Sequence, residues 1–194
     1  MSISKSKSKG LKEGRRMSRE EWLTHALDVL EKEGGGALTI DALSRRLGVS
    51  RGSFYWHFKD RTDFIHQLVD RWSMISLSSV DSEVDLPELD AKQRLLLLME
   101  AIVNQRLARY DNAVRAWASR DPSTKKMVKK IDDYRLNYVR SLFAEIGFKG
   151  DELKMRTRTF VVYFSLETAL FSRMSHKEQL KHIQAMHALL TRLE

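Results

Sequence analysis

The segment 39–59 constrains the fold most strongly, because two short helical patterns meet there at one glycine. Its first half repeats apolar residues at the helical spacing i, i+3, i+7: Ile40, Leu43 and Leu47. Gly48 follows, where a left-handed residue that ends a helix is easiest for glycine. Ser50 can cap the next helix by accepting a backbone N–H bond. Two short helices on so tight a turn are typical of a DNA-binding helix-turn-helix, whose second helix enters the major groove.

The second helix of this segment divides into an inner and an outer face. Phe54 and Phe58 are four residues apart and are predicted to pack inward together. The outer face would then carry cationic, aromatic and hydrogen-bonding side chains: Arg51, Ser53, Tyr55, Trp56 and His57. Such a surface suits base edges and phosphates. A short surface turn in an ordinary helical protein would share this pattern, since short helix-turn-helix matches also arise by chance.

The run G-V-S-R-G-S-F-Y-W-H-F-K-D-R, preceded by T-I-D-A-L-S-R-R-L, resembles the DNA-binding domain of TetR family transcriptional regulators. The residues that match the family pattern are Gly48, Val49, Ser50, Gly52, Tyr55, His57 and Phe58. Leu43 and Ser44 stand where an Ile-Ala pair is usual, and Phe54 stands where leucine is usual. Arg61 replaces the usual phosphate-binding lysine, which keeps the charge but changes the geometry.

The resemblance implies a DNA-binding surface made of Thr39, Arg45, Ser50, Arg51, Ser53, Tyr55, Trp56, His57, Lys59 and Arg61. We expect base contacts from Arg51, Ser53 and Trp56. We expect phosphate contacts from Thr39, Tyr55, His57, Lys59 and Arg61. A homodimer with two such helices would read double-stranded DNA as a near-palindromic operator, with half-sites about one helical turn apart or slightly more.

Composition favours a helical protein with a polyanionic partner. The 194 residues include only two prolines, and 42% of them are hydrophobic, which allows a sizeable core. The net charge of +8 and the pI of about 9.7 favour nucleic acid, or less strongly an anionic membrane surface, as the partner. The absence of cysteine excludes disulfides and cysteine catalysis and suits a reducing compartment. We expect a cytoplasmic, nucleoid-associated protein without a secretory signal or a membrane-spanning segment.

Three regions are predicted along the chain. Residues 1–17 alternate Ser, Lys and Gly and form a disordered basic arm, which either contacts DNA or serves as a solubilising tail. Residues 18–75 form the helix-turn-helix domain and a connecting helix, and 76–194 form a helical effector-binding and dimerisation domain. Within the latter, 76–90 is acidic, contains Pro87 and is predicted to be a linker.

Helix-capping signals predict an all-α chain of about nine helices. Two S-x-x-E capping boxes open the first and the last helix at Ser18 and Ser175. Three aspartates can cap helices in between: Asp60, Asp90 and Asp121. The helix after Asp90 is predicted to reach about Arg109. The helix after Asp121 is predicted to turn Val128, Ile131, Tyr134, Tyr138 and Leu142 inward.

The resemblance implies two roles for the C-terminal region, effector binding and dimerisation. The last two helices would pair with their copies as a four-helix bundle, although their apolar content would equally suit an ordinary core. An unknown small-molecule effector, with no cofactor, would bind among Met99, Asn104, Tyr110, Trp117, Tyr134, Tyr138, Phe160, Tyr163, Phe164 and Glu167. Each of these residues also suits plain core. Glu167 would meet either a cationic effector or a basic side chain such as Arg156.

No pattern in the chain predicts an enzyme. There is no H-E-x-x-H motif, no metal-ligand spacing among the histidines and no nucleophile elbow around a serine. We therefore expect a sequence-specific transcriptional regulator, a repressor released by its effector. The alternatives are a DNA-binding structural or protein-interaction factor of the same fold without an effector, and a helical enzyme or carrier in which the motif is vestigial.

Overall fold

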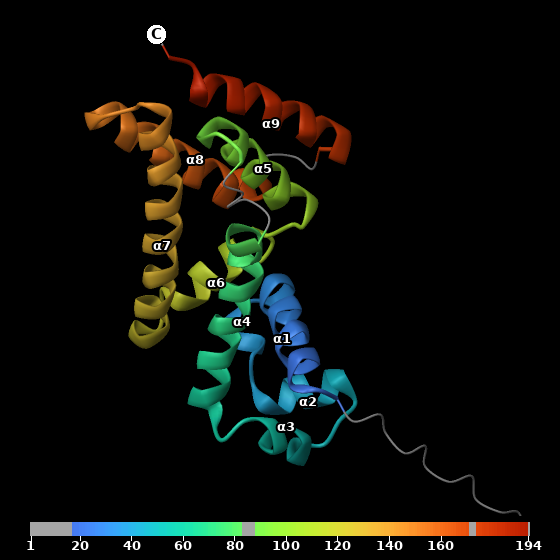
Figure 1. The fold of residues 1–194 in the computed structure, drawn as a ribbon. Coiled ribbons are helices and arrows are strands. Elements are labelled where there is room, and N and C mark those ends of the chain that lie inside the picture. The colour runs from blue at the N-terminus through green and yellow to red at the C-terminus, as the bar shows by residue number, and fades with distance from the viewer. Residues whose placement is uncertain (1–16, 83–87, 171–173, 194) are drawn as a thin grey trace, which may run out of the picture.

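The computed structural model describes residues 17–82, 88–170 and 174–193, and all regular structure in these ranges is helical (Figure 1). The predicted basic arm, apart from Met17, lies outside these ranges. The elements in chain order are α1 (Arg19–Glu33), the 3-10 turn η1 (Gly35–Ala37), α2 (Ile40–Leu47), α3 (Arg51–His57), α4 (Arg61–Ser82), α5 (Ala91–Asn104), α6 (Asp111–Ala118), α7 (Pro122–Ile146), α8 (Gly150–Leu170) and α9 (His176–Thr191). The prediction of an all-α chain is confirmed for this part of the protein.

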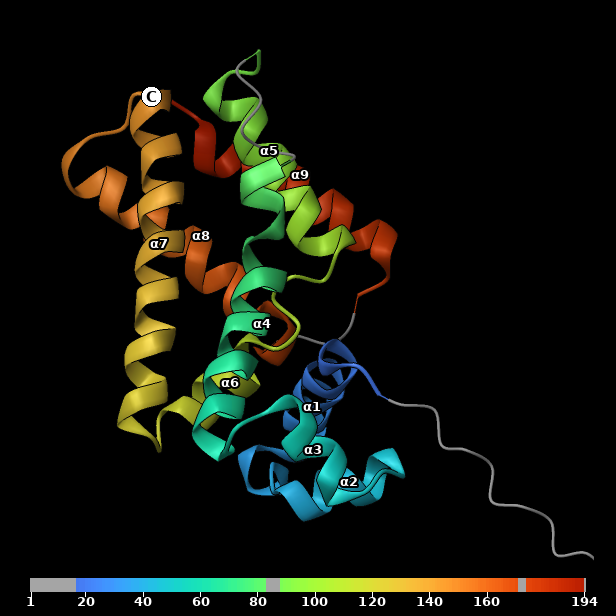
Figure 2. The same cartoon turned by 60° about the horizontal axis from the view of Figure 1, so that its bottom comes forward.

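Helices α1, α2 and α3 gather at one end of the molecule (Figures 1 and 2), and α9 lies at the opposite end in the view of Figure 1. Helix α4 leads from the first group toward the rest. It packs against α1 at one end and against α5 and α7 further along. Helix α6 contacts α1, η1, α7 and α8, so it lies between the two halves of the molecule. The long helices α7 and α8 pack on each other, and α9 covers α5.

The predicted caps begin the helices as expected. The hydroxyl of Ser18 accepts the amide N–H of Glu21 at 3.2 Å, and the Glu21 carboxylate accepts the amide of Ser18 at 2.8 Å. The same reciprocal pair opens α9 at Ser175. Each of the three aspartates accepts a backbone N–H of the first turn of its helix: Asp60, Asp90 and Asp121. These bonds satisfy amides that have no partner inside the helix.

Two helix ends differ from the prediction. Helix α4 continues through Ser82 into the segment predicted as a linker, because the first helix-breaking residue after it is Pro87. Helix α5 ends at Asn104 and not near Arg109. Arg106 there takes a left-handed φ of 53°, and the Leu107 amide bonds the Ile102 carbonyl at 3.0 Å. An arginine thus occupies the position that glycine normally holds at such an end, which the sequence does not signal.

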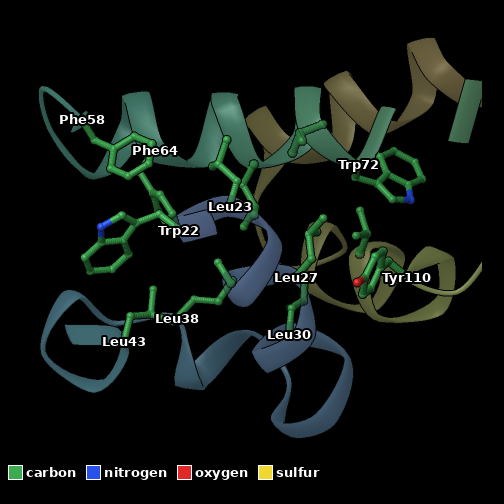
Figure 3. Packing of buried hydrophobic residues seen from close by; sticks show 14 of the residues in the cluster. Trp22, Leu23, Leu27, Leu30, Leu38, Leu43, Phe58, Phe64, Trp72 and Tyr110 are labelled. Carbon is green, nitrogen blue, oxygen red and sulfur yellow. The ribbon is translucent and has the colours of Figure 1, made fainter. Parts of the chain in front are cut away.

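The buried side chains form two clusters. The first joins α1–α4 to α6 and the start of α7, and its largest members include Trp22, Phe64 and Trp72 (Figure 3). The second joins α5 and α7–α9 around Leu95, Met99 and Phe143. Fully burying one such side chain stabilises the fold by about 1.5–3 kcal/mol. Since α6 residues belong to the first cluster, the core of the helix-turn-helix extends beyond the predicted 18–75 unit.

Gly35 marks the place where the N-terminal helices touch α6. A Cβ atom on Gly35 would lie 2.3 Å from Cδ1 of Trp117, whereas a Cβ atom on Gly36 would meet nothing within 4 Å. Gly34 has a positive φ, but Gly35 and Gly36 do not. The backbone at both of these positions therefore accepts alanine. The glycine at 35 is therefore required by the contact with the indole ring.

We predict that Gly35→Ala destabilises the protein by about 1–3 kcal/mol, because the Trp117 ring must shift in a packed core. Gly36→Ala is the matched control and should change the free energy of unfolding by less than about 0.5 kcal/mol. Denaturant unfolding of both variants measures the difference. Equal stability of the two variants would show that the Gly35–Trp117 contact does not constrain the fold.

Ser44 is the second position with a specific stability prediction. It is 5% exposed, and its hydroxyl has no hydrogen-bond partner within the described structure. A buried hydroxyl without a partner costs stability, and alanine is the better helix former. Ser44→Ala should therefore stabilise the protein by about 1 kcal/mol. Thr39→Ala, which removes the side-chain cap of α2, should destabilise the protein by about 1 kcal/mol. Unfolding of both variants in urea measures the two changes. Loss of stability in Ser44→Ala would contradict this assignment.

Candidate nucleic-acid interface

The turn between α2 and α3 has the geometry that the sequence predicts. Gly48 ends α2 in the left-handed conformation, with φ 64° and ψ 30°. The Val49 amide then donates to the Ser44 carbonyl at 3.0 Å, which closes the turn. Ser50 caps α3 by accepting the Ser53 amide at 3.3 Å. The chain therefore leaves one helix and starts the next within three residues, as a helix-turn-helix requires.

The inner face of α3 is held by aromatic packing. Phe54 is fully buried, and its ring centroid lies 5.7 Å from Trp22 of α1, 5.0 Å from Phe58 and 5.4 Å from Phe64 of α4. The pairs with Trp22 and Phe64 are edge to face and the pair with Phe58 is tilted, and aromatic pairs of this kind add about 0.5–1.5 kcal/mol each beyond the burial itself. Four aromatic rings thus fix the rotation of α3 about its axis. They determine which of its side chains face outward.

The outer face of α3 is open to solvent. Trp56 is 81% exposed and Tyr55 is 53% exposed, so two adjacent aromatic rings face the solvent. Arg51 is also exposed, and its guanidinium lies 3.1 Å from the carboxylate of Asp41 on α2. Both members of this ion pair are more than half exposed, so the pair positions Arg51 without adding much stability. In Figure 1, this helix lies at the end of the molecule farthest from α9.

Two predicted outer-face residues have partners within the protein. Ser53 is half-buried, and its hydroxyl accepts the indole N–H of Trp22 at 3.4 Å. His57 is also half-buried, with Nε2 2.7 Å from the carbonyl oxygen of Met17. The hydroxyl of Ser53 can still donate outward. His57 instead ties the end of α3 to the chain just before α1, a role that the sequence did not indicate.

The remaining predicted residues lie around α3. Thr39, Arg45 and Ser50 are exposed on the α2 side, although the hydroxyls of Thr39 and Ser50 also serve as caps. Lys59 and Arg61 are exposed between α3 and α4. The Lys59 amide donates to Asp63 at 2.9 Å, a bond that helps lower the pKa of that carboxyl after the larger effect of Gln67. Arg61 lines a cleft together with Trp117, Arg120 and Asp121, so its side chain lies at the edge of the predicted DNA-binding surface.

A small cavity of about 60 Å³ lies in the C-terminal helices. Three of the predicted pocket residues line it: Tyr138, Phe160 and Phe164. The other lining residues are Leu98, Ile102, Leu107, Ala108, Asp111, Arg135, Val139, Val161 and Ser165. The lining is therefore mostly apolar, with two charged side chains, Asp111 and Arg135.

Seven predicted pocket residues are not among those lining the cavity. Met99 is buried in the second cluster, Tyr110 belongs to the first cluster, and Trp117 packs on Gly35. Asn104 is exposed at the end of α5, and Tyr134, predicted to face inward, is 46% exposed. Tyr163 and Glu167 are half-buried on α8. Arg156 does not pair with Glu167: it bonds Glu152 and the carbonyls at the end of α9.

The sequence did not predict the charged cluster beside this cavity. Asp111 is 2% exposed and accepts the indole N–H of Trp72 at 2.9 Å. Arg135 bonds both oxygens of that carboxylate, at 2.9 and 3.3 Å. Arg115 lies 3.0 Å from Asp111 and 2.6 Å from Asp132. Asp111, Arg115, Asp132 and Arg135 form the four-charge cluster between α6 and α7, and the bond from Trp72 connects this cluster to α4.

The segment before Asp111 also contacts α1. Arg109 donates to Glu31 at 2.7 and 2.9 Å and lies 2.9 Å from Asp28. The Tyr110 hydroxyl donates to Asp28 at 2.8 Å. Burial, together with this hydrogen bond, raises the pKa of Tyr110 to about 12, so the phenol is protonated and acts as the donor. We call these bonds from Arg109 and Tyr110 to Asp28 and Glu31 the α1 clasp.

Two features expected of other protein classes are not found in the described residues. No group of three or more His, Asp or Glu side chains in ranges 17–82, 88–170 and 174–193 is arranged to hold a metal ion. No helix in the part of the chain that the structure describes is long and apolar enough to cross a membrane.

Comparison with known proteins identifies the helix-turn-helix. Residues 23–68, which span most of α1 through the first part of α4, match the family model described as "Bacterial regulatory proteins, tetR family". The chain is 30% identical over 164 residues to the tetracycline repressor protein class C of Escherichia coli, covering 84% of this chain and 69% of that protein. It is 27% identical over 146 residues to the class A repressor from transposon 1721 of Escherichia coli, covering 75% and 62%.

Shorter similarities and solved structures agree with this assignment. The match to the transcriptional regulator AcrR of Shigella flexneri covers 39% of that protein, so this chain spans less than two thirds of AcrR and of the class A repressor. The TetR family regulator PfmR from Thermus thermophilus has the same fold, with a TM-score of 0.72 over 92% of this chain and 98% of PfmR, at 16% identity. The chain belongs to the TetR family of transcriptional regulators and carries the DNA-binding helix-turn-helix fold of that family.

Proposed function

We propose that this protein is a homodimeric repressor that binds a near-palindromic operator through α3 and is released by a small-molecule effector. The observation that carries the proposal is the outer face of α3, where Tyr55 and Trp56 are exposed on a helix whose inner face is locked. An aromatic ring on such a helix suits apolar contact with thymine methyl groups, and a neighbouring cation suits bonds to guanine or to phosphates. The net charge of +8 supports a polyanionic partner.

Selection of bound sequences from a random duplex pool tests this function. Purified protein at near-physiological salt should enrich an inverted repeat whose half-sites lie about one helical turn apart or slightly more. Bulk binding that depends on salt but enriches no sequence would contradict the proposal. It would favour a DNA-binding structural factor of the same fold.

Base contacts and phosphate contacts can be separated by two substitutions. Arg51→Ala should weaken operator binding by about 1–3 kcal/mol and relax sequence preference at one position of each half-site. Lys59→Ala should weaken binding to all sequences alike and make the dependence of affinity on salt less steep. Arg140→Ala, at an exposed position on α7 far along the chain from α3, is the control and should bind as wild type. Titration of labelled operator at several salt concentrations measures all three. If Arg51→Ala and Lys59→Ala both bind the operator as tightly as Arg140→Ala does, the proposed DNA surface is wrong.

The dimer is proposed to form through α8 and α9. Helix α8 exposes Met155 and Val162, which are seven residues apart and therefore on one face. Helix α9 exposes Leu189, whose carbonyl oxygen accepts a bond from Arg156 of α8 at 3.1 Å, so α8 and α9 are in contact near this residue. Exposed apolar side chains on two neighbouring helices favour burial against a second copy, and a two-fold dimer uses the same surface twice.

We predict that Val162→Arg yields a monomer and lowers operator affinity, because an arginine at the proposed interface must be desolvated without a partner. Met74→Arg on α4 is the matched control, since Met74 is 64% exposed and Val162 is 56% exposed. Light scattering after size-exclusion chromatography measures the mass of each variant. A Val162→Arg protein that remains dimeric would place the interface elsewhere.

The cavity beside the four-charge cluster is the proposed effector site. Mostly apolar walls with a few polar groups are typical of ligand pockets. Its present volume of about 60 Å³ is below the roughly 300 Å³ at which such pockets begin, so an effector of ordinary size must enlarge it. To release the operator, the effector must bind more tightly to a dimer whose α3 helices are wrongly spaced for DNA than to the DNA-binding dimer. Only such a difference in effector affinity shifts the equilibrium between the two states.

A further inference from the structure

We propose that the effector is an uncharged, mainly apolar small molecule, and that it enlarges the cavity by displacing the turn 105–110, which withdraws the α1 clasp. This inference rests on the proposed function, because it specifies the ligand and the signal of the same site. It combines three observations. The four-charge cluster has no net charge, one wall of the cavity is a turn and not a helix, and the residues at the end of that turn contact α1.

The charge cluster argues against a charged ligand. Its two arginines and two aspartates sum to zero, and both oxygens of Asp111 are already bonded. A ligand carboxylate would have to take Arg135 from Asp111, and a ligand ammonium would have to take Asp111 from its three donors. Removing one partner of a buried ion pair is strongly unfavourable. An uncharged ligand leaves the cluster intact and gains from the apolar walls, which include Leu98, Phe160 and Phe164.

One wall of the cavity is suited to move. Helices α5, α7 and α8 form most of the lining, and α7 packs directly on both others. Leu107 and Ala108 line the cavity from a turn that is not helical. The turn includes Arg106, whose φ of 53° is strained for a residue other than glycine. A ligand larger than the cavity therefore displaces this turn at a lower cost than it parts the packed helices.

The same turn holds the DNA-binding helices. Leu107 and Ala108 face the cavity, whereas the next two residues, Arg109 and Tyr110, form the clasp on Asp28 and Glu31 of α1. Helix α1 in turn supports α3, since Trp22 packs on Phe54. Displacement of residues 107 and 108 therefore pulls on the clasp, and loss of the clasp lets α1 shift together with α3. The four consecutive residues 107–110 thus connect the cavity directly to α1.

The ligand class is tested with four probes built on aromatic rings. Toluene and naphthalene are uncharged, whereas benzoate and benzylamine add one negative or one positive charge to a ring of the same size. Toluene or naphthalene should raise the melting temperature of the full chain and lower its operator affinity at least about 5-fold, the lower end of typical allosteric coupling. Benzoate and benzylamine at equal concentration should do neither. Stabilisation by a charged probe, or none by either hydrocarbon, would overturn the ligand class.

The clasp is tested with the double variant Asp28→Ala with Glu31→Ala, which removes both carboxylates that Arg109 and Tyr110 bond and leaves a good helix former at each position of α1. The hydrocarbon should stabilise this variant as it stabilises the wild type, yet change its operator affinity less than about 2-fold. The control is Asp133→Asn, which breaks the exposed ion pair with Lys129 outside the clasp and should keep the full response. A full response in the double variant would overturn the signalling route.

Failure of this inference can be distinguished from failure of the proposed function. Operator binding without any probe tests the function, and the melting temperature with the probe tests the ligand class in the absence of DNA. If wild type binds no operator but toluene or naphthalene still stabilises it, the ligand class stands and the function is wrong.

Discussion

The packing of Trp22 against Phe54 is the interaction on which the two faces of α3 depend. Trp22 is fully buried in α1, its ring meets Phe54 and Phe58 edge to face, and its N–H reaches Ser53. These contacts fix the inner face of a helix that is only seven residues long and could not be stable alone. Tyr55 and Trp56 face outward as a result, so the proposed DNA surface follows from the core behind it.

A second consequence of this packing concerns the rest of the molecule. Because α3 is held by α1, whatever holds α1 also orients α3. Helix α1 contacts α4, η1 and α6, and the α1 clasp adds charged bonds from the segment before α6. The first buried cluster accordingly includes Tyr110 and Val114. The helix-turn-helix and the C-terminal helices share part of one core, which gives a route between a ligand and the DNA surface.

The sequence predicted the features that depend on neighbouring residues. The capping boxes at Ser18 and Ser175 and the glycine turn at Gly48 are short-range patterns with one stable solution, and the structure has all of them. The inward pair Phe54 and Phe58 follows from helical spacing alone. Comparison with known proteins confirmed the family to which these patterns pointed.

Features that depend on distant residues were not predictable. Helix α5 ends early because Leu107 is buried beside the cavity and Tyr110 in the first cluster, and no residue there signals a stop. Asp111 meets Trp72 and Arg135 across 39 and 24 residues of sequence, so periodicity could not pair them. Apolar residues such as Met99 look alike in a core and in a pocket, and only the packed structure separates the two. The contacts of Ser53 and His57 with α1 and Met17 were hidden for the same reason.

Trp56 offers the most direct test that the outer face of α3 binds DNA. Of the four tryptophans, Trp22 and Trp72 are fully buried and Trp117 is half-buried, so acrylamide should quench mainly Trp56 in the free protein. Binding of the selected operator should protect this fluorescence from acrylamide, and Trp56→Phe should remove both the quenching and the protection. Unchanged quenching of Trp56 in a protein that is fully bound to operator would show that DNA binds another surface.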